Sequence, residues 1–133
     1  MKGYVDDIET VTLANGDFRR VLYTGHNLQL VVMSINPGEE IGAEVHEDRD
    51  QFFRIEEGEG EIRIDGVANR VEDDFAVIVP AGARHNVINT GDAPLRLYTL
   101  YGPPEHRDGI VHRKKDQAER DHANDHWDGE TTE

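Results

Sequence analysis

Four side chains in the middle of this 133-residue chain have the types and spacing of metal ligands: Glu44, His46, Gln51 and His85. Glu44 and His46 are two residues apart in a segment that is expected to be extended, so their side chains point to the same face. Gln51 begins the next expected strand, and His85 lies on a later one. Two imidazoles and a carboxylate resemble the facial triad that leaves metal positions open for substrate. We therefore predict one divalent ion here (Mn, Fe, Ni or Zn), with Gln51 as a fourth ligand or as a hydrogen-bond partner that orients Glu44.

The segments that must position these side chains have the pattern of short strands separated by turns. The expected strands are Val11–Leu13, Phe18–Thr24, Leu28–Ile35, Ala43–Glu47, Phe52–Glu56, Glu61–Ile64, Val67–Val71, Phe75–Val79, His85–Asn89 and Leu95–Tyr101. Asn15-Gly16 predicts a hairpin between the first two of them. Many short strands without a sustained helical period indicate an all-β sandwich or barrel.

For three of these strands, the sequence also predicts which face is buried. Phe53 and Ile55 share the face of Gln51 by alternation, so we expect them to line the cavity, a placement that a plain barrel core would share. Phe75–Val79 is apolar throughout, which is typical of a strand covered on both faces. Tyr98 and Tyr101 lie on opposite faces of the last strand, so at most one faces the cavity, and no separate catalytic residue is identified.

The composition changes after the last expected strand. Residues 102–133 contain few apolar side chains, so we predict a domain of residues 1–101 and a polar C-terminal tail, 102–133, that is partly helical or disordered. Its one expected helix is Lys114–Ala123. His122 and His126 have a spacing that can hold a metal on a helix, although a solvated tail is the favoured interpretation. Glu105 and His106 could fold back over the mouth of the barrel.

The charge balance excludes several classes of partner. The chain has 14 basic and 28 acidic residues, a net charge of −14, which repels nucleic-acid phosphates and anionic lipid. No apolar run approaches the ~18 residues of a membrane span, and no secretion signal is visible, so a cytoplasmic location is expected. The absence of cysteine excludes thiolate ligands. An acidic, lysine-poor surface is typical of salt-adapted proteins, and a preference for arginine codons is the alternative.

The spacing around the candidate ligands resembles the two motifs of the cupin superfamily. The stretch Pro37-Gly38-x5-Glu44-x-His46-x4-Gln51-x6-Gly58 is similar to the first motif, G-x5-H-x-H-x3–4-E-x6-G. The stretch Asp74-x5-Pro80-x-Gly82-x2-His85-x3-Asn89 is similar to the second, G-x5-P-x-G-x2-H-x3-N. The resemblance covers residues 28–101. It implies a small single-domain cupin (monocupin) with a double-stranded β-helix, or jelly-roll, barrel.

Three positions depart from the family pattern. Glu44 replaces a histidine, Gln51 replaces a glutamate and Asp74 replaces a turn glycine. The site keeps one carboxylate but moves it, and it has one imidazole fewer than the usual set. These donors make a harder, more oxygen-rich site, so the identity of the metal stays open.

The expected function is that of a metal-dependent enzyme acting on a small oxygenated substrate. It would be a sugar isomerase or epimerase that uses the metal as a Lewis acid, or a dioxygenase with Fe or Mn. The alternative is a non-enzymatic module that binds or senses a small ligand in the same barrel.

The resemblance to small cupins also implies a homodimer formed by strand exchange. Its interface is expected to use the N-terminal strands and an outer sheet face. The net charge opposes association, so the dimer should tighten as salt screens it.

Overall fold

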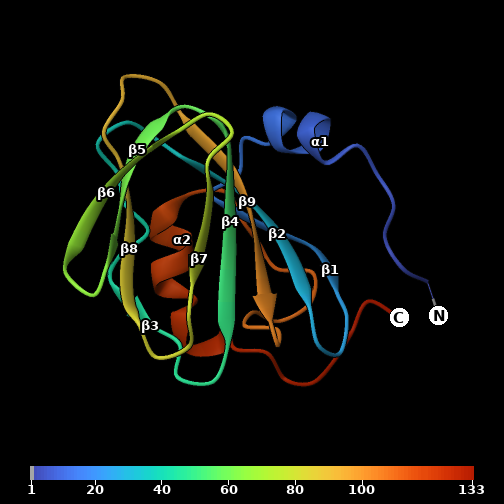
Figure 1. Ribbon diagram of the computed structural model, residues 1–133. Coiled ribbons are helices and arrows are strands. Elements are labelled where there is room, and N and C mark those ends of the chain that lie inside the picture. The colour runs from blue at the N-terminus through green and yellow to red at the C-terminus, as the bar shows by residue number, and fades with distance from the viewer. Residues whose placement is uncertain (1) are drawn as a thin grey trace.

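Two antiparallel sheets face each other and form a barrel in the computed structural model, which describes residues 2–133 (Figure 1). The larger sheet has the strand order β10-β1-β2-β9-β4-β7, and the smaller one has the order β3-β8-β5-β6. The strands are β1 (Arg19–Thr24), β2 (Gln29–Ile35), β3 (Glu44–Val45), β4 (Asp50–Glu57), β5 (Glu59–Ile64), β6 (Val67–Glu72), β7 (Ala76–Val79), β8 (Arg84–Asn89), β9 (Leu95–Gly102) and β10 (Val111–His112). This architecture confirms the prediction of an all-β, jelly-roll fold.

The inward faces of the two sheets form one apolar core. Side chains on β4 and β9 alternate between buried and partly exposed, as expected for strands with one face turned inward. The most deeply buried apolar side chains include Val31, Met33, Ile35, Phe53, Ile55, Ile62, Val79, Val87, Leu95 and Leu97. Burial of this apolar surface holds the sheets together and fixes the register of each strand, because a one-residue slip would turn its apolar set outward.

The N-terminal segment is helical, so the predicted strand Val11–Leu13 and the hairpin at Asn15-Gly16 are wrong. Helix α1 (Ile8–Ala14) begins after Asp7, whose carboxylate accepts a 3.1 Å hydrogen bond from the backbone N–H of Thr10. The side chain of Asn15 bonds the backbone of Asp17 in both directions and closes a local turn instead of a hairpin. Side chain–backbone bonds at both ends therefore outweighed the strand pattern.

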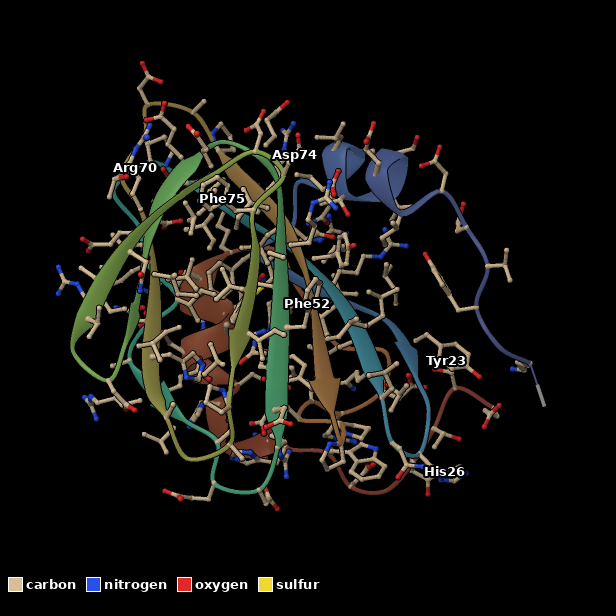
Figure 2. The ribbon with its side chains drawn as sticks, viewed as in Figure 1. Tyr23, His26, Phe52, Arg70, Asp74 and Phe75 are labelled. Atoms are coloured by element: carbon tan, nitrogen blue, oxygen red, sulfur yellow. The ribbon has the colours of Figure 1, made fainter. Side chains whose placement is uncertain are left out.

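The strand β7 lies at the edge of the larger sheet, paired with β4 on one side. Val79 is buried, but Ile78 is 70% exposed and Phe75 is 44% exposed, so the predicted cover on both faces is wrong for the single chain. Figure 2 shows Phe75 beside the start of this strand. The strand β1 lies between β10 and β2 in the same sheet as β7, so within the chain it extends that sheet sideways and does not cover a face of β7.

Residues after β9 pack against the barrel. The strand β10 extends the larger sheet by pairing Arg19 with His112. Helix α2 (Lys115–Arg120) is followed by a short 3-10 helix (His122–Asn124), and Ala118 of α2 joins the buried core, so this helix is not polar on every side. Both ends of the described chain lie on the same side of the molecule, where the Lys2 ammonium donates to the Thr132 carbonyl over 2.9 Å (Figure 1). Within residues 2–133, none of the helices has the length and apolar character needed to cross a bilayer.

Candidate metal centre

The structure brings together three of the four predicted ligands. Glu44 on β3 pairs directly with His85 on β8, and His46 follows β3 by one residue. One donor atom from each side chain lies within 4.8 Å of the others, and within residues 2–133 these are the only three His, Asp or Glu side chains grouped in this way. The two imidazole rings are 5.3 Å apart between centroids. The two-residue pairing of β3 with β8 therefore brings Glu44 and His85 together, although they are far apart in the sequence.

The orientation of His85 leaves one ring nitrogen available to a metal. Its Nδ1 lies 3.1 Å from the carbonyl oxygen of Ala83, which can only accept a hydrogen bond, so Nδ1 carries the proton. The lone pair is then on Nε2, as in histidines that bind metal through one nitrogen and hold a carbonyl with the other. Burial lowers the pKa of His85, and the nearby charge of His46 lowers it further, so the ring is neutral at pH 7.

The Nε2 of His46 is buried and has no hydrogen-bond partner, although Glu44 Oε2 lies 3.0 Å away. Two ligands each ~2.1 Å from one ion and at a right angle are ~3.0 Å apart, so this spacing fits two donors to a shared cation as well as a hydrogen bond between the two groups. On the other side of the ring, Nδ1 faces Glu105 Oε1 at 3.5 Å. Burial alone would lower the pKa of His46, but the carboxylates of Glu44 and Glu105 outweigh burial and raise it.

Glu44 supplies the negative charge of the cluster. Burial opposes its ionisation, but its contact with His46 and the charge of Arg19 outweigh burial and lower the pKa of Glu44. The carboxylate is therefore ionised at neutral pH and ready to bind a cation.

Gln51 is buried on the inward face of β4, with 3% of its surface exposed. Its Nε2 donates a 3.0 Å hydrogen bond to Thr99 Oγ1, which fixes the orientation of the amide. The amide oxygen Oε1 is buried and has no partner. Phe53, two residues on, meets the ring of His85 edge to face at 6.3 Å, while Ile55 belongs to the buried core. Gln51 thus has a free acceptor on the side of β4 that faces the cluster.

Residues 104–106 form a strap beside the cluster, in the place where the sequence suggested that the chain could fold back. The side-chain amide of Gln29 donates to the carbonyl of His106 at 2.7 Å and accepts from the N–H groups of His106 and Glu105 at 3.0 and 3.2 Å. Arg49 donates to Glu105 Oε1 at 2.7 Å and to the Pro104 carbonyl at 2.6 Å. These bonds hold Glu105 next to His46.

A buried polar network lies behind His46. The Tyr101 ring meets His46 edge to face at 5.8 Å, and its hydroxyl lies 3.1 Å from His106 Nε2. His106 Nδ1 lies 2.9 Å from Asp125 Oδ2. Burial strongly raises the pKa of Tyr101 and lowers the pKa of His106, so both are neutral at pH 7. Alternation along β9 predicted that at most one of Tyr98 and Tyr101 faces the cavity, but no sequence signal joins residues 101, 106 and 125.

The histidine pair of the tail does not form a second cluster. The rings of His122 and His126 are 5.4 Å apart, and His126 Nδ1 is 3.9 Å from Glu105 Oε2. In the part of the chain that the structure describes, neither histidine belongs to a group of three possible ligands. The structure therefore gives no support for a metal site at His122 and His126, which their spacing had allowed.

A cavity of about 240 Å³ opens beside Glu44. It is lined by Phe18, Arg19, Ile41, Glu44, Lys115, Ala118, Glu119 and His122. Because β3 contributes to it on one side and α2 on the other, residues of the C-terminal segment complete the wall of the cavity.

Comparison with known proteins identifies the family of this chain. The sequence model of the cupin domain matches residues 31–101. The Bacillus subtilis protein YrkC is 45% identical over 123 residues, which cover 88% of this chain and 66% of YrkC, so the chain spans just under two thirds of that relative. The crystal structure of BH2720 from Bacillus halodurans superposes with a TM-score of 0.88 at 45% identity, over 90% of this chain and 95% of that one. The Streptomyces glaucescens tetracenomycin polyketide synthase protein TcmJ is 30% identical over 80 residues, 60% of this chain and 54% of that protein. The family match spans more than half of the chain and contains Glu44, His46, Gln51 and His85, and the chain belongs to the cupin domain family.

Proposed function

We propose that this cupin binds one divalent metal ion through Glu44, His46 and His85, with Gln51 as a fourth donor, and that it is an enzyme acting on a small oxygenated molecule. The main support for the proposal is the cluster of Glu44, His46 and His85, whose donor atoms lie within 4.8 Å of one another, together with the buried and unpartnered Oε1 of Gln51. Each buried polar atom left unpaired costs ~1–3 kcal/mol. A cation shared by the cluster and Gln51 Oε1 would satisfy this acceptor.

The residues around the cluster suit reactions on oxygen-rich substrates. A divalent ion supplies Lewis-acid polarisation of a substrate oxygen, and Fe or Mn adds dioxygen chemistry. Glu44 holds the compensating charge, the Ala83 carbonyl fixes the ring of His85, and Glu105 faces the outer nitrogen of His46. Isomerisation or epimerisation is the first class to test, and dioxygenation is the second. The similarity to TcmJ, whose name refers to polyketide synthesis, supports oxygenated organic molecules as substrates.

A binding or sensor module is the second candidate. It is favoured by the hydrogen bonds that already occupy the side chains that could act as a general base. Glu105 is held by Arg49 at 2.7 Å, and the Tyr101 hydroxyl is neutral and contacts His106. Neither is free to take a proton from a substrate. Testing every compound that raises the melting temperature for turnover separates the two candidates: a stabilising ligand that is never converted identifies a binding module.

Metal analysis is the first experiment on this proposal. Protein purified without a metal-affinity tag should contain, or take up, one divalent ion per chain. Sugar-phosphate and catechol-type screens on the loaded protein then test the reaction class. A protein that refuses Mn, Fe, Co, Ni and Zn would end the proposal.

Metal affinity should depend on pH through His46. Its pKa is raised above the ordinary value of 6.5 by Glu44 and Glu105, after allowing for burial, which acts in the opposite direction. An ion must displace the proton from this ring, so affinity should fall by about tenfold per pH unit below that pKa and level off above it. Calorimetric titrations from about pH 5 to about pH 9 measure this profile. A flat profile would show that His46 is not a ligand.

We also propose that two copies of the chain associate through the outer side of β7. The exposed Ile78 and Phe75 border an apolar groove of about 320 Å³, at a sheet edge that pairs on one side only. An exposed apolar sheet edge favours pairing with another chain even when it is as short as the four residues of β7, and a two-fold axis places the same patch on both partners. This interface is an alternative to the one through the N-terminal strands that the sequence analysis expects, because β1 already pairs with β2 within the chain.

Light scattering tests the dimer. The wild-type protein should have twice the chain mass and should associate more tightly from low salt to about 1 M salt, because salt screens the net charge of −14. Ile78→Glu should give the mass of a single chain, whereas Val67→Glu, at an equally exposed valine outside the groove, should not. A single-chain mass for wild type at every salt concentration would refute the dimer.

A further inference from the structure

A buried arginine lies beside the candidate metal centre with too few partners. Arg19 is the first residue of β1, and only 7% of its side chain is exposed. Its Nε has no hydrogen-bond partner. Its ion pair with Asp125, from Nη1 to Oδ2, spans 3.6 Å, which is longer than an N–H···O hydrogen bond. A buried cation held so loosely carries a large desolvation cost, which a closer anion would offset.

Asp125 does not fill that role, because its carboxylate is already engaged elsewhere. Asp125 Oδ2 lies 2.9 Å from His106 Nδ1, the shortest contact it makes with a charged or ring nitrogen, and its Oδ1 is buried without a partner. Neither oxygen forms the paired, parallel contact that a guanidinium makes with a carboxylate in its own plane. Arg19 therefore keeps donor capacity that Asp125 does not use, and Arg19 also lines the neighbouring cavity.

The cavity next to Arg19 has the shape and chemistry of a pocket for a small organic anion. Arg19 and Glu44 both line its 240 Å³ volume, so the free guanidinium and a candidate metal ligand face the same space. Phe18, Ile41 and Ala118 give it an apolar wall. The remaining charged residues, Lys115 and Glu119, pair with each other at 3.8 Å. Arg19 differs from Lys115 in its burial, since 7% of the Arg19 side chain is exposed against 24% for Lys115, and Arg19 Nε has no hydrogen-bond partner.

We propose that Arg19 binds the carboxylate of a small 2-hydroxy or 2-oxo acid whose neighbouring oxygen is directed to the metal centre. This inference rests on the proposed function, because it names the substrate class of the same site. The planar fork of a guanidinium matches a planar carboxylate. A single buried arginine next to Glu44, in a chain of net charge −14, favours a monoanion over a phosphate dianion. The apolar wall accommodates the carbon chain of the acid.

Binding of simple acids tests the proposal. Lactate, glycolate and pyruvate are titrated by calorimetry into metal-loaded and metal-free protein, with 1,2-propanediol as the neutral analogue of lactate and inorganic phosphate as the competing anion. At least one acid should bind and should raise the melting temperature. Propanediol should not bind, and phosphate should bind more weakly than the acid.

Arg19→Met removes the charge and keeps the length of the apolar stem. It should weaken acid binding by at least about tenfold, the loss expected when a hydrogen bond to a charged group is removed, while leaving metal affinity within threefold of wild type, roughly the scatter expected for a residue that does not touch the ion. Arg20→Met is the matched control, since Arg20 is exposed on the opposite face of β1, and it should bind acid like wild type. If Arg19→Met does not fold, Arg19→Lys replaces it with the same expectation, because a single ammonium cannot offer two parallel N–H groups.

Asp125→Asn separates a ligand-binding role from a merely structural one. If Arg19 serves only to balance Asp125, this change should not affect acid binding. If Arg19 binds the acid, loss of its competing carboxylate should strengthen binding by a measurable factor. Unchanged acid affinity in a folded Arg19 variant, equal binding of propanediol, or no binding of any acid would overturn the proposal. Failure of every metal to bind would instead refute the proposed function, and the acid titrations of metal-free protein would still decide the role of Arg19.

Discussion

Replacing His85 with alanine is expected to abolish tight metal binding, with a loss of at least about a hundredfold in affinity. The ring is held by the Ala83 carbonyl so that Nε2 keeps its lone pair, and no other described His, Asp or Glu side chain is grouped with Glu44 and His46 to replace it. Gln51→Ala should weaken binding by about tenfold or less, because a neutral amide oxygen is a poorer donor than an imidazole. Calorimetric titration with Mn, Ni and Zn measures both effects.

The control for this pair of variants is His26→Ala. His26 is exposed in the turn between β1 and β2 (Figure 2). These strands belong to the larger sheet, whereas β3 and β8 belong to the smaller one. Its loss should leave metal affinity unchanged, and the melting temperature of each variant shows whether it is folded. An equal loss from His85→Ala and Gln51→Ala would show that Gln51 is a full ligand. Wild-type affinity in folded His85→Ala would remove His85 from the site.

Replacing Gln29 with leucine is expected to destabilise the fold by about 3 kcal/mol, because it leaves three backbone groups of the strap without partners, two of them buried. The amide of Gln29 is fully buried and bonds the N–H groups of Glu105 and His106 and the carbonyl of His106. Release of the strap also moves Glu105 away from His46, so metal affinity should fall by about tenfold. Denaturant unfolding and calorimetry measure the two losses.

Leu28→Ala is the matched control for this change. Leu28 is the preceding residue and is 54% exposed, so its truncation should change the free energy of unfolding by less than ~0.5 kcal/mol. A loss of under ~1 kcal/mol in Gln29→Leu would mean that the strap finds other partners. An unchanged metal affinity would show that Glu105 does not position His46.

The parts of the fold that were predictable from sequence are those in which local pattern and burial agree. Alternation on β4 and β9 follows directly from one buried and one outer face. The spacing of Glu44 and His46 placed them on one side of a short strand, and the resemblance to the second motif identified His85. These positions come together because alternation fixes the face of each side chain and the register between paired strands fixes which residues lie opposite each other.

The parts that were not predictable depend on contacts between distant segments. Helix α1 formed where Asp7 capped the segment, so the apolar pair of Val11 and Leu13 did not act as a strand. The C-terminal segment contains few apolar residues, yet Ala118 and the bonds of Gln29 attach it to the barrel. The one signal overlooked on β1 was Arg19, a charged residue two positions before the buried Val21 and therefore on its inward face.

Anomalous X-ray scattering at the absorption edge of the bound metal is the most direct test of the metal centre. Crystals of protein purified without an affinity tag, or soaked with Mn, Fe, Co, Ni or Zn, provide the measurement. We predict one strong peak per chain, bounded by Glu44 Oε2, His46 Nε2 and His85 Nε2, with Gln51 Oε1 on its fourth side. Absence of a peak among these atoms after every soak, or a peak held by other residues, would contradict it.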